Sequence, residues 1–152
     1  NASGVNIVVD AEGDLLMNTL KFRPFLVKPN HYELCRILNL PITTDKSIIV
    51  NYALILNQLG ARNVLVSMAG DGAVLVTEHG GVIKCDAPKG EVIDSVGAGD
   101  ATVAGFIAGW SEMQDYEYAF KMGVSSGSAK CFNGKFAKRD QIIEIFNKID
   151  IY

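Results

Sequence analysis

The chain has 152 residues, of which 49% are hydrophobic and 20% charged, and its formal net charge is −3. A chain of this length buries roughly 70% of its unfolded surface, so we expect one α/β domain over residues 1–152. The composition excludes a disordered chain and a basic nucleic-acid-binding arm. A membrane span is also excluded, because the longest uncharged stretch, Ser47–Ala61, is too short.

Two further features of the composition constrain the chain. Thirteen of its 15 glycines lie between Gly60 and Gly134, which indicates special demands on the backbone there. The three cysteines, Cys35, Cys85 and Cys131, are far apart and form no CxxC pair. We therefore expect reduced thiols, which predict a cytoplasmic location.

Predicted strands and helices alternate in the first part of the chain. We predict strands at residues 5–10 and 25–28, and helices at 13–20, at 30–39 and from Thr44 or Asp45 to Gly60. Asn30 is a good N-cap, and Glu33 stands at the third helical position, as in a capping box. In the helix that Gly60 ends, the apolar face is predicted at Ile48, Tyr52, Ile55 and Leu59.

Glycine-containing turns separate three short predicted strands, at residues 63–67, 73–77 and 82–85, which suggests an antiparallel edge. A short extended piece is predicted at 91–93. Three helices follow, at about 97–110, 116–131 and 138–149, and in the first of them Val103, Phe106 and Trp110 share one face. This order predicts an α/β fold with helices layered on a mostly parallel sheet.

Chemistry is most evident in residues 94–101, with the sequence D-S-V-G-A-G-D-A. A glycine-rich turn leads into a helix whose first amides are unpaired and lie at the positive end of the helix dipole, which suits a phosphate. The carboxylate of Asp100 would repel that phosphate, but it could accept a proton from an attacking hydroxyl. The combination predicts phosphoryl transfer, with Asp100 as the base.

Other interpretations of the same residues are open. Asp100 could be an ordinary first-turn acid that complements the helix dipole, and the bare pattern makes this about equally probable. A dinucleotide-binding fingerprint is excluded, because Thr102 stands where its third glycine belongs. A P-loop is excluded as well, because no Gly-Lys-Ser/Thr follows.

Three motifs together resemble the ribokinase-like (PfkB) carbohydrate kinases, in particular their 1-phosphofructokinase and tagatose-6-phosphate kinase branch. Residues 94–100 resemble the family signature D-T-V-G-A-G-D, with Ser95 in place of threonine. Residues 28–33, K-P-N-H-Y-E, resemble K-P-N-x-x-E, and residues 66–73 resemble V-S-L-G-x-x-G-A. In the last motif Ala69 replaces the usual glycine, so either Gly70 takes over a positive φ or Ala69 tolerates it.

The resemblance implies a three-layer ribokinase-like fold and roles for particular residues. Asp100 would be the catalytic base toward a sugar hydroxyl, and the amides of Gly97, Ala98, Gly99 and Asp100 would form the anion hole. Asn30 and Glu33 would contact Mg²⁺ and the phosphates, partly through water. Glu33 is the residue that the resemblance implies for the metal. The remaining contacts to ATP are implied for Lys28, Ser67, Gly70, Asp71, Gly72 and, more weakly, Ser125. Gly123 and Gly127 near Ser125 could equally serve close helix packing.

The implied activity is ATP-dependent phosphorylation of a sugar phosphate of the fructose 1-phosphate or tagatose 6-phosphate type. Family members are considerably longer, so we expect this chain to be the C-terminal, nucleotide-binding part of such a kinase. The alternatives are a non-catalytic nucleotide-binding fragment and another kinase of the same family. We expect no nucleic-acid or membrane partner. A second copy or the missing N-terminal half would cover the apolar segment 5–9.

Overall fold

The computed structural model describes residues 4–152, which form two compact units that divide after Lys84. Each unit is described by itself, in chain order. The prediction of a single domain over residues 1–152 stays a prediction.

The first unit is built on a sheet whose strands follow the order β1-β2-β3-β4-β5. β1 pairs with β2 and β2 with β3 in parallel, whereas β3 and β4 are antiparallel, with Val66 opposite Val74. The predicted α/β class, with a mostly parallel sheet and an antiparallel edge, is confirmed. The strands are β1 (Val8–Val9), β2 (Leu26–Val27), β3 (Asn63–Ser67), β4 (Ala73–Val76) and β5 (Val82–Cys85).

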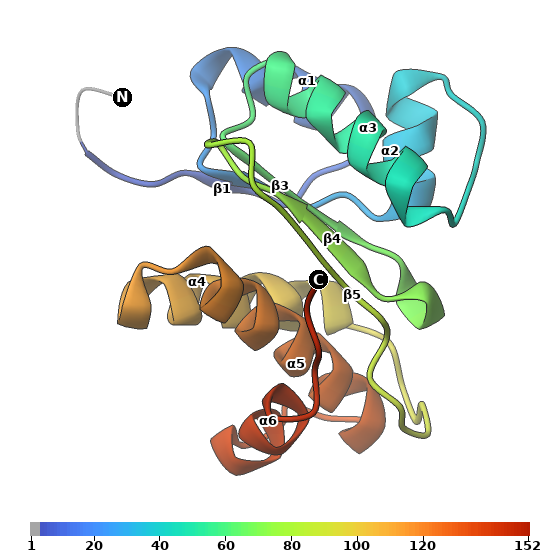
Figure 1. The fold of residues 1–152 in the computed structure, drawn as a ribbon, viewed down its shortest axis with the longest axis vertical. Coiled ribbons are helices and arrows are strands. Elements are labelled where there is room, and N and C mark those ends of the chain that lie inside the picture. Colours follow the sequence, from blue (N-terminus) through green and yellow to red (C-terminus); the bar gives the residue numbers. More distant parts are fainter. Residues whose placement is uncertain (1–3) are drawn as a thin grey trace. The chain divides into compact units, whose positions relative to one another are not determined.

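Three helices lie on one face of this sheet, and a 3-10 turn follows the first of them (Figure 1). They are α1 (Gly13–Thr19), η1 (Leu20–Phe22), α2 (His31–Leu38) and α3 (Lys46–Gln58). A second 3-10 turn, η2 (Ala69–Asp71), joins β3 to β4. Strands β2 and β4 are buried along their whole length, as expected for strands without a solvent-facing side. The helices and strands close on a core that includes Leu16, Val27, Leu34, Leu56, Val64 and Val76.

The prediction of the apolar face of α3 is wrong. The buried face of α3 consists of Ile49, Ala53 and Leu56, one position along from the predicted face. Ile48 and Leu59 from the predicted face are 39% and 49% exposed. The helix is apolar around most of its circumference, so spacing alone does not select the face that packs. At residues 91–93, where we predict a short extended piece, the chain has neither helix nor strand, and the backbone amide of Ile93 donates to the carbonyl oxygen of Cys131.

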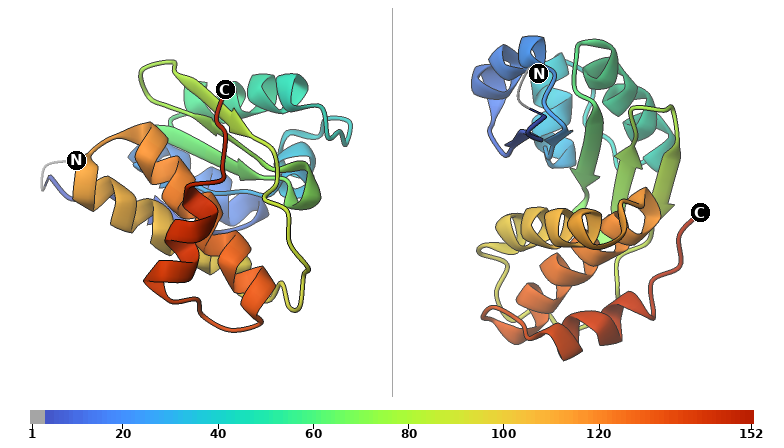
Figure 2. Two further views of the ribbon diagram at one scale, coloured as in Figure 1. Left: turned by 60° about the horizontal axis from the view of Figure 1, so that its bottom comes forward. Right: turned by 90° about the vertical axis from the view of Figure 1, so that its left-hand side faces the viewer.

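The second unit is helical, with α5 packed against both α4 and α6 (Figure 2). The helices are α4 (Ala98–Met113), α5 (Tyr116–Asn133) and α6 (Arg139–Phe146). In α4, Phe106 is fully buried as predicted, but the buried stripe continues through Gly105 and Gly109 rather than through Val103 and Trp110. Small residues therefore line the side of α4 that packs.

Glycines on α4 and α5 allow the two helices to approach closely. A Cβ at Gly109 would lie 2.9 Å from Cα of Ala119, and one at Gly123 would lie 3.0 Å from the carbonyl oxygen of Thr102. A Cβ at Gly127 would meet the Thr102 hydroxyl and lie 3.1 Å from the carbonyl oxygen of Ala98. Helix packing thus accounts for Gly123 and Gly127, and it accounts for part of the glycine excess.

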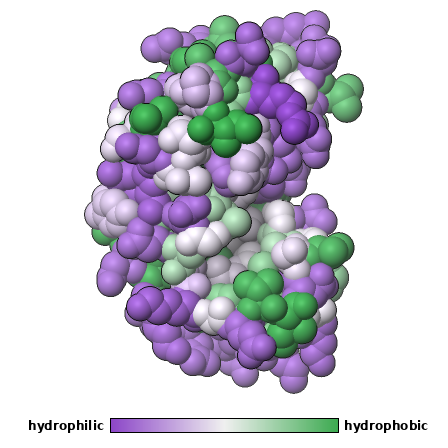
Figure 3. Space-filling model, turned by 90° about the vertical axis from the view of Figure 1, so that its right-hand side faces the viewer, coloured by the Kyte–Doolittle hydropathy of each residue, from purple (hydrophilic) through white to green (hydrophobic). Residues whose placement is uncertain are grey.

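Large hydrophobic side chains also occur on the surface, where Figure 3 shows them as separate patches among hydrophilic residues. Val5 and Ile7, which precede the edge strand β1, are 58% and 43% exposed. What covers them stays a prediction. Among residues 4–152, no helix has both the length and the apolar character needed to cross a membrane.

Replacing Gly60 with alanine tests the end of α3. Gly60 has a φ of +131°, and a Cβ there would clash with the carbonyl oxygen of Leu20. We expect Gly60→Ala to lower the free energy of unfolding by about 3 kcal/mol, measured by urea denaturation. Gly70→Ala is the matched control, because Gly70 has no atom within 4 Å of such a Cβ and no positive φ. Equal stability of the two variants would contradict the strain assigned to Gly60.

Candidate functional site

The first group of predicted site residues lies at the carboxyl ends of the parallel strands in the first unit. Lys28 directly follows β2, and Ser67 ends β3. An isolated parallel bridge pairs Asn30 with Ser67, and the Ser67 amide donates to the carbonyl oxygen of Pro29 at 3.2 Å. The K-P-N and V-S motifs, which are far apart in the sequence, are therefore neighbours. In open α/β sheets this edge is where ligands bind.

Lys28 is buried, and its ammonium is paired within the unit. The Nζ atom lies 3.3 Å from Oδ1 of Asp10, which follows β1 at the same edge of the sheet. The Lys28 side chain is 7% exposed and that of Asp10 is 37% exposed. A buried lysine needs such a partner, and the pair fixes where the ammonium points. Asp10 therefore belongs to the group of polar residues at this edge of the sheet, where it pairs with Lys28.

Asn30 and Glu33 form the predicted capping box at the start of α2. The Asn30 side chain accepts from the Glu33 amide at 2.9 Å. In return, one Glu33 carboxylate oxygen accepts from the Asn30 amide at 2.9 Å, and the other accepts from Asn30 Nδ2 at 2.6 Å. Both carboxylate oxygens of Glu33 are therefore engaged, so capping is a sufficient structural reason for this residue.

The turn at residues 67–72 takes an unusual backbone conformation. Ala69 has a φ of +49°, whereas Gly70 has no positive φ and Gly72 has a φ of +93°. Ala69 thus adopts the left-handed conformation itself, and Gly70 does not take over that requirement. The amides of Asp71 and Gly72 donate to the carbonyl oxygens of Met68 and Ala69. These bonds hold Gly70 and Asp71 on the exposed side of the turn.

The second group lies at the start of α4 in the second unit. Gly97 is the N-cap with a φ of +79°, and no side chain caps the helix. The Ala98 amide donates to the carbonyl oxygen of Ser95 at 3.1 Å, so it is engaged within the loop. Among residues 4–152, the amides of Gly97, Gly99 and Asp100 have no acceptor. The anion hole that we predict therefore narrows to three amides, beside the exposed Asp100.

Two bonds to Asp94 hold the loop before Gly97. Its Oδ1 accepts from the Val96 amide at 2.9 Å, and its Oδ2 accepts from Nζ of Lys130 at 2.8 Å. Both bonds lower the pKa of the Asp94 carboxyl below its ordinary value, the Lys130 bond most. The Lys130 side chain is only 8% exposed. This lysine is the residue that sequence analysis missed, because 36 positions separate it from Asp94.

Ser125 belongs to the second unit, where it is fully buried. Its hydroxyl donates to the carbonyl oxygen of Lys121 at 2.6 Å, one turn back along α5. This bond satisfies the hydroxyl within the helix. The suggested contact between Ser125 and ATP stays a prediction.

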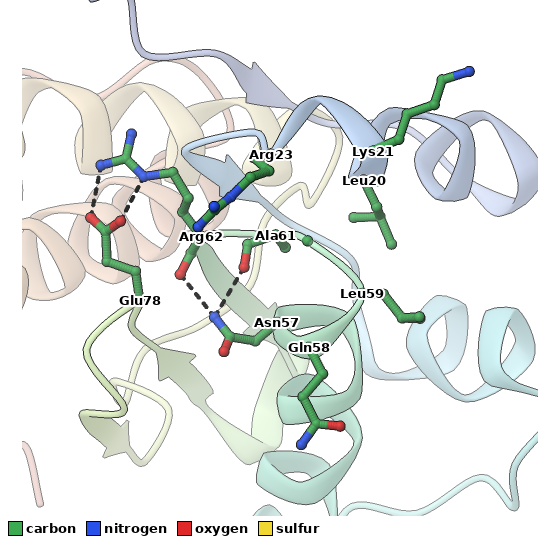
Figure 4. Close-up of a pocket in the computed structure, with 10 residues that line it drawn as sticks. Leu20, Lys21, Arg23, Asn57, Gln58, Leu59, Ala61, Arg62 and Glu78 are labelled. Carbon is green, nitrogen blue, oxygen red and sulfur yellow. Dashed lines mark hydrogen bonds and ion pairs between the residues drawn. The ribbon is translucent and has the colours of Figure 1, made fainter. Parts of the chain in front are cut away.

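A pocket of about 390 Å³ lies at the opposite end of β3, and none of the predicted site residues lines it (Figure 4). Arg62 forms a two-pronged ion pair there with Glu78, with N–O distances of 2.6 and 2.8 Å. Asn57 Nδ2 donates to the carbonyl oxygens of Ala61 and Arg62. Arg62, Glu78 and Asn57 thus have partners among the residues that line the pocket, as the dashed lines in Figure 4 show.

The comparison with protein families gives one assignment. Residues 1–137 match the pfkB family carbohydrate kinases. The chain therefore belongs to the pfkB family of carbohydrate kinases, as the three motifs predicted.

Similar proteins support the same family. The chain is 40% identical to 1-phosphofructokinase of Bacillus subtilis and 30% identical to D-tagatose-1-phosphate kinase of Klebsiella oxytoca. Each match covers 95% of this chain but 47% of the relative. The chain thus spans about half the length of these relatives.

Solved structures confirm the ribokinase-like fold. A Staphylococcus aureus protein, named provisionally as a phosphofructokinase, has a TM-score of 0.93 at 36% identity, over 99% of this chain and 49% of that chain. Phosphofructokinase-2 from Escherichia coli, solved in complex with substrates and products, has a TM-score of 0.86 at 27% identity. That match covers 97% of this chain and 48% of the other.

Proposed function

We propose that this chain is the C-terminal, nucleotide-binding part of a kinase that transfers a phosphoryl group from ATP to a hydroxyl of a sugar phosphate. The observation that carries the proposal is the start of α4, where Asp100 stands beside the free amides of Gly97, Gly99 and Asp100 itself. Phosphoryl transfer needs both a group that accepts the hydroxyl proton and donors for the charge on the phosphate. The names of the relatives favour fructose 1-phosphate, or a tagatose monophosphate, as the acceptor.

The steps follow from the chemistry of these groups. The Asp100 carboxylate accepts the proton of the sugar hydroxyl as its oxygen attacks the γ-phosphorus. The bond between that phosphorus and the bridging oxygen breaks, and ADP leaves. The free amides at the start of α4 stabilise the negative charge that develops on the transferred group. At the sheet edge of the first unit, Lys28 supplies a positive charge for the ATP phosphates, and Asn30 with Ser67–Gly72 supplies polar backbone and side-chain contacts.

Magnesium fits this scheme as an ion carried mainly by ATP. Among residues 4–152, no three His, Cys, Asp or Glu side chains are grouped so that they could hold a metal. Mg²⁺ typically keeps several waters and binds one or two carboxylates plus phosphate oxygens, which needs no larger cluster. Glu33 would act on such an ion through water, because both of its oxygens already accept bonds from Asn30. When bound, the ion would neutralise phosphate charge.

A second candidate function is a non-catalytic nucleotide-binding fragment. It is favoured by the share of the relatives that this chain spans, which is 47% for the Bacillus subtilis enzyme. Such a fragment would keep the anion hole but lack the sugar site that the family resemblance assigns to the other half. Another substrate within the pfkB family is a third candidate, and the K-P-N motif argues against it.

Replacing Asp100 in the full-length protein tests its role as the base. We expect Asp100→Asn to lower the turnover number about 10²- to 10⁴-fold and to leave ATP affinity nearly unchanged, measured by coupled ADP release and calorimetry. Asp140→Asn is the matched control, because Asp140 is an exposed acid in the first turn of α6. Equal, small effects of the two variants would mean that Asp100 only complements a helix dipole.

Replacing Glu33 separates its capping role from a role toward magnesium. Glutamine also completes a capping box, so Glu33→Gln should change the free energy of unfolding by less than about 1 kcal/mol. If Glu33 binds the ion through water, Glu33→Gln should need an Mg²⁺ concentration at least about tenfold higher than the wild-type protein for half-maximal turnover. Glu117→Gln, an exposed first-turn acid of α5, serves as the control. If Glu33→Gln had the same Mg²⁺ requirement as the wild-type protein, Glu33 would serve only to cap α2.

An assay of the 152-residue chain by itself tests the second candidate function, the non-catalytic nucleotide-binding fragment. We expect the chain to bind ATP weakly and to release no ADP in the presence of fructose 1-phosphate or tagatose 6-phosphate. The measurement is a coupled ADP-release assay on the purified chain, with the full-length protein as the positive control. Robust turnover by the chain would show that the other half is dispensable for chemistry.

A further inference from the structure

One ion pair of the second unit joins the end of α5 to the turn before α4. Lys130 lies near the end of α5, and its side chain is 8% exposed. Burying an ammonium costs free energy unless the charge is compensated. Its hydrogen-bond acceptors are Oδ2 of Asp94, at 2.8 Å, and more weakly the Asp94 carbonyl oxygen, at 3.4 Å. The lysine therefore holds both the side chain and the backbone of Asp94.

The acid that Lys130 holds is itself part of the turn leading into α4. The other carboxylate oxygen of Asp94 accepts from the Val96 amide at 2.9 Å, directly before Gly97. The lysine also reaches the N-cap, because a Cβ on Gly97 would lie 3.9 Å from Cε of Lys130. Two backbone amides, of Ile93 and Asp94, donate to the carbonyl oxygen of the next residue, Cys131. The end of α5 thus holds the entire turn.

The pair also matters for charge. The Asp94 side chain is 41% exposed and stands close in sequence to the free amides of Gly97 and Gly99, so its negative charge would weaken the binding of a phosphate there. The ammonium of Lys130 compensates this charge at short range. A partly buried pair is also screened by salt less than an exposed one.

We propose that Lys130 is a positioning residue for phosphate binding, which fixes the turn before the anion hole and neutralises Asp94 beside it. The inference rests on the proposed function, because it presupposes that the start of α4 binds phosphate. It deepens that function by assigning a role to a residue outside the three motifs.

The test is an NMR titration of the 152-residue chain with inorganic tripolyphosphate, which follows the amide signals of Gly97, Gly99 and Asp100. We expect Lys130→Met to weaken tripolyphosphate binding about tenfold or more, as expected for loss of one charge-assisted bond. Lys148→Met is the matched control for loss of one positive charge, because Lys148 forms an exposed ion pair with Glu144. It should change the affinity less than about twofold.

A second variant separates the neutralising role from simple stabilisation. In Asp94→Asn the side-chain oxygen can still accept from the Val96 amide, but the negative charge is gone. Affinity for tripolyphosphate should therefore be clearly higher than in Lys130→Met, because the positive charge of Lys130 remains while the negative charge is removed. Comparable weakening in Asp94→Asn and Lys130→Met would overturn the inference, because a merely structural pair predicts the same direction for both. Asp94→Asn also provides a test if Lys130→Met does not fold.

The outcomes distinguish the inference from the proposed function. If the wild-type chain and Lys130→Met bound tripolyphosphate with equal affinity, the inference would be overturned, but the phosphate site at the start of α4 would still be supported. If tripolyphosphate shifted none of the three amides in the wild-type chain, the inference and the anion hole would fall together. As an independent readout, Lys130→Met should raise the pKa of the Asp94 carboxyl, because it removes that group's main stabilising bond.

Discussion

The close contact between α4 and α5 is the constraint on which the proposed chemistry of the second unit depends. A Cβ at Gly127 would meet the Thr102 hydroxyl and the carbonyl oxygen of Ala98, in the first turns of α4. Absence of side chains at this contact lets α5 support the start of α4 directly. A helix start binds a phosphate well only if its amides are held in place, because reorganisation during the reaction would cost free energy. In the proposed function, Gly127 thus serves the anion hole without touching a ligand.

The two units hold their predicted site residues by the same kind of device. In the first unit, the buried ammonium of Lys28 pairs with Asp10 at the carboxyl ends of β2 and β1. In the second, the buried ammonium of Lys130 pairs with Asp94 before α4. In each pair, a buried lysine contacts a partly exposed aspartate. Each pair lies next to residues that we assign to phosphate binding. We infer that these buried pairs fix the positions of the side chains more than they stabilise the fold.

Much of the fold could be predicted from the sequence where a local signal decides the structure. Asn30 and Glu33 predict the start of α2, because a capping box is a local device. The buried face of α3 could not be predicted, since Ile48 and Ile49 are equally apolar and only tertiary packing chooses between them. Ala69 illustrates the same limit, because the sequence offered Gly70 as an alternative for the positive φ.

The residues of the candidate site also differ in how far a local sequence signal predicts them. The motifs predict a site at Asp100 and its neighbouring amides, because the pattern of glycines before an acid is continuous in the sequence. Lys130 carried only a faint signal, namely one charged residue in a run of small and apolar ones near the end of α5. Its role depends on a contact with Asp94, 36 residues away, that only the folded chain creates.

The most direct test of the central claim is a crystal structure of the chain with a non-hydrolysable ATP analogue. We expect phosphate oxygens within hydrogen-bonding distance of the amides of Gly97, Gly99 and Asp100. An analogue bound with its phosphates away from the start of α4 would contradict the assignment of the anion hole.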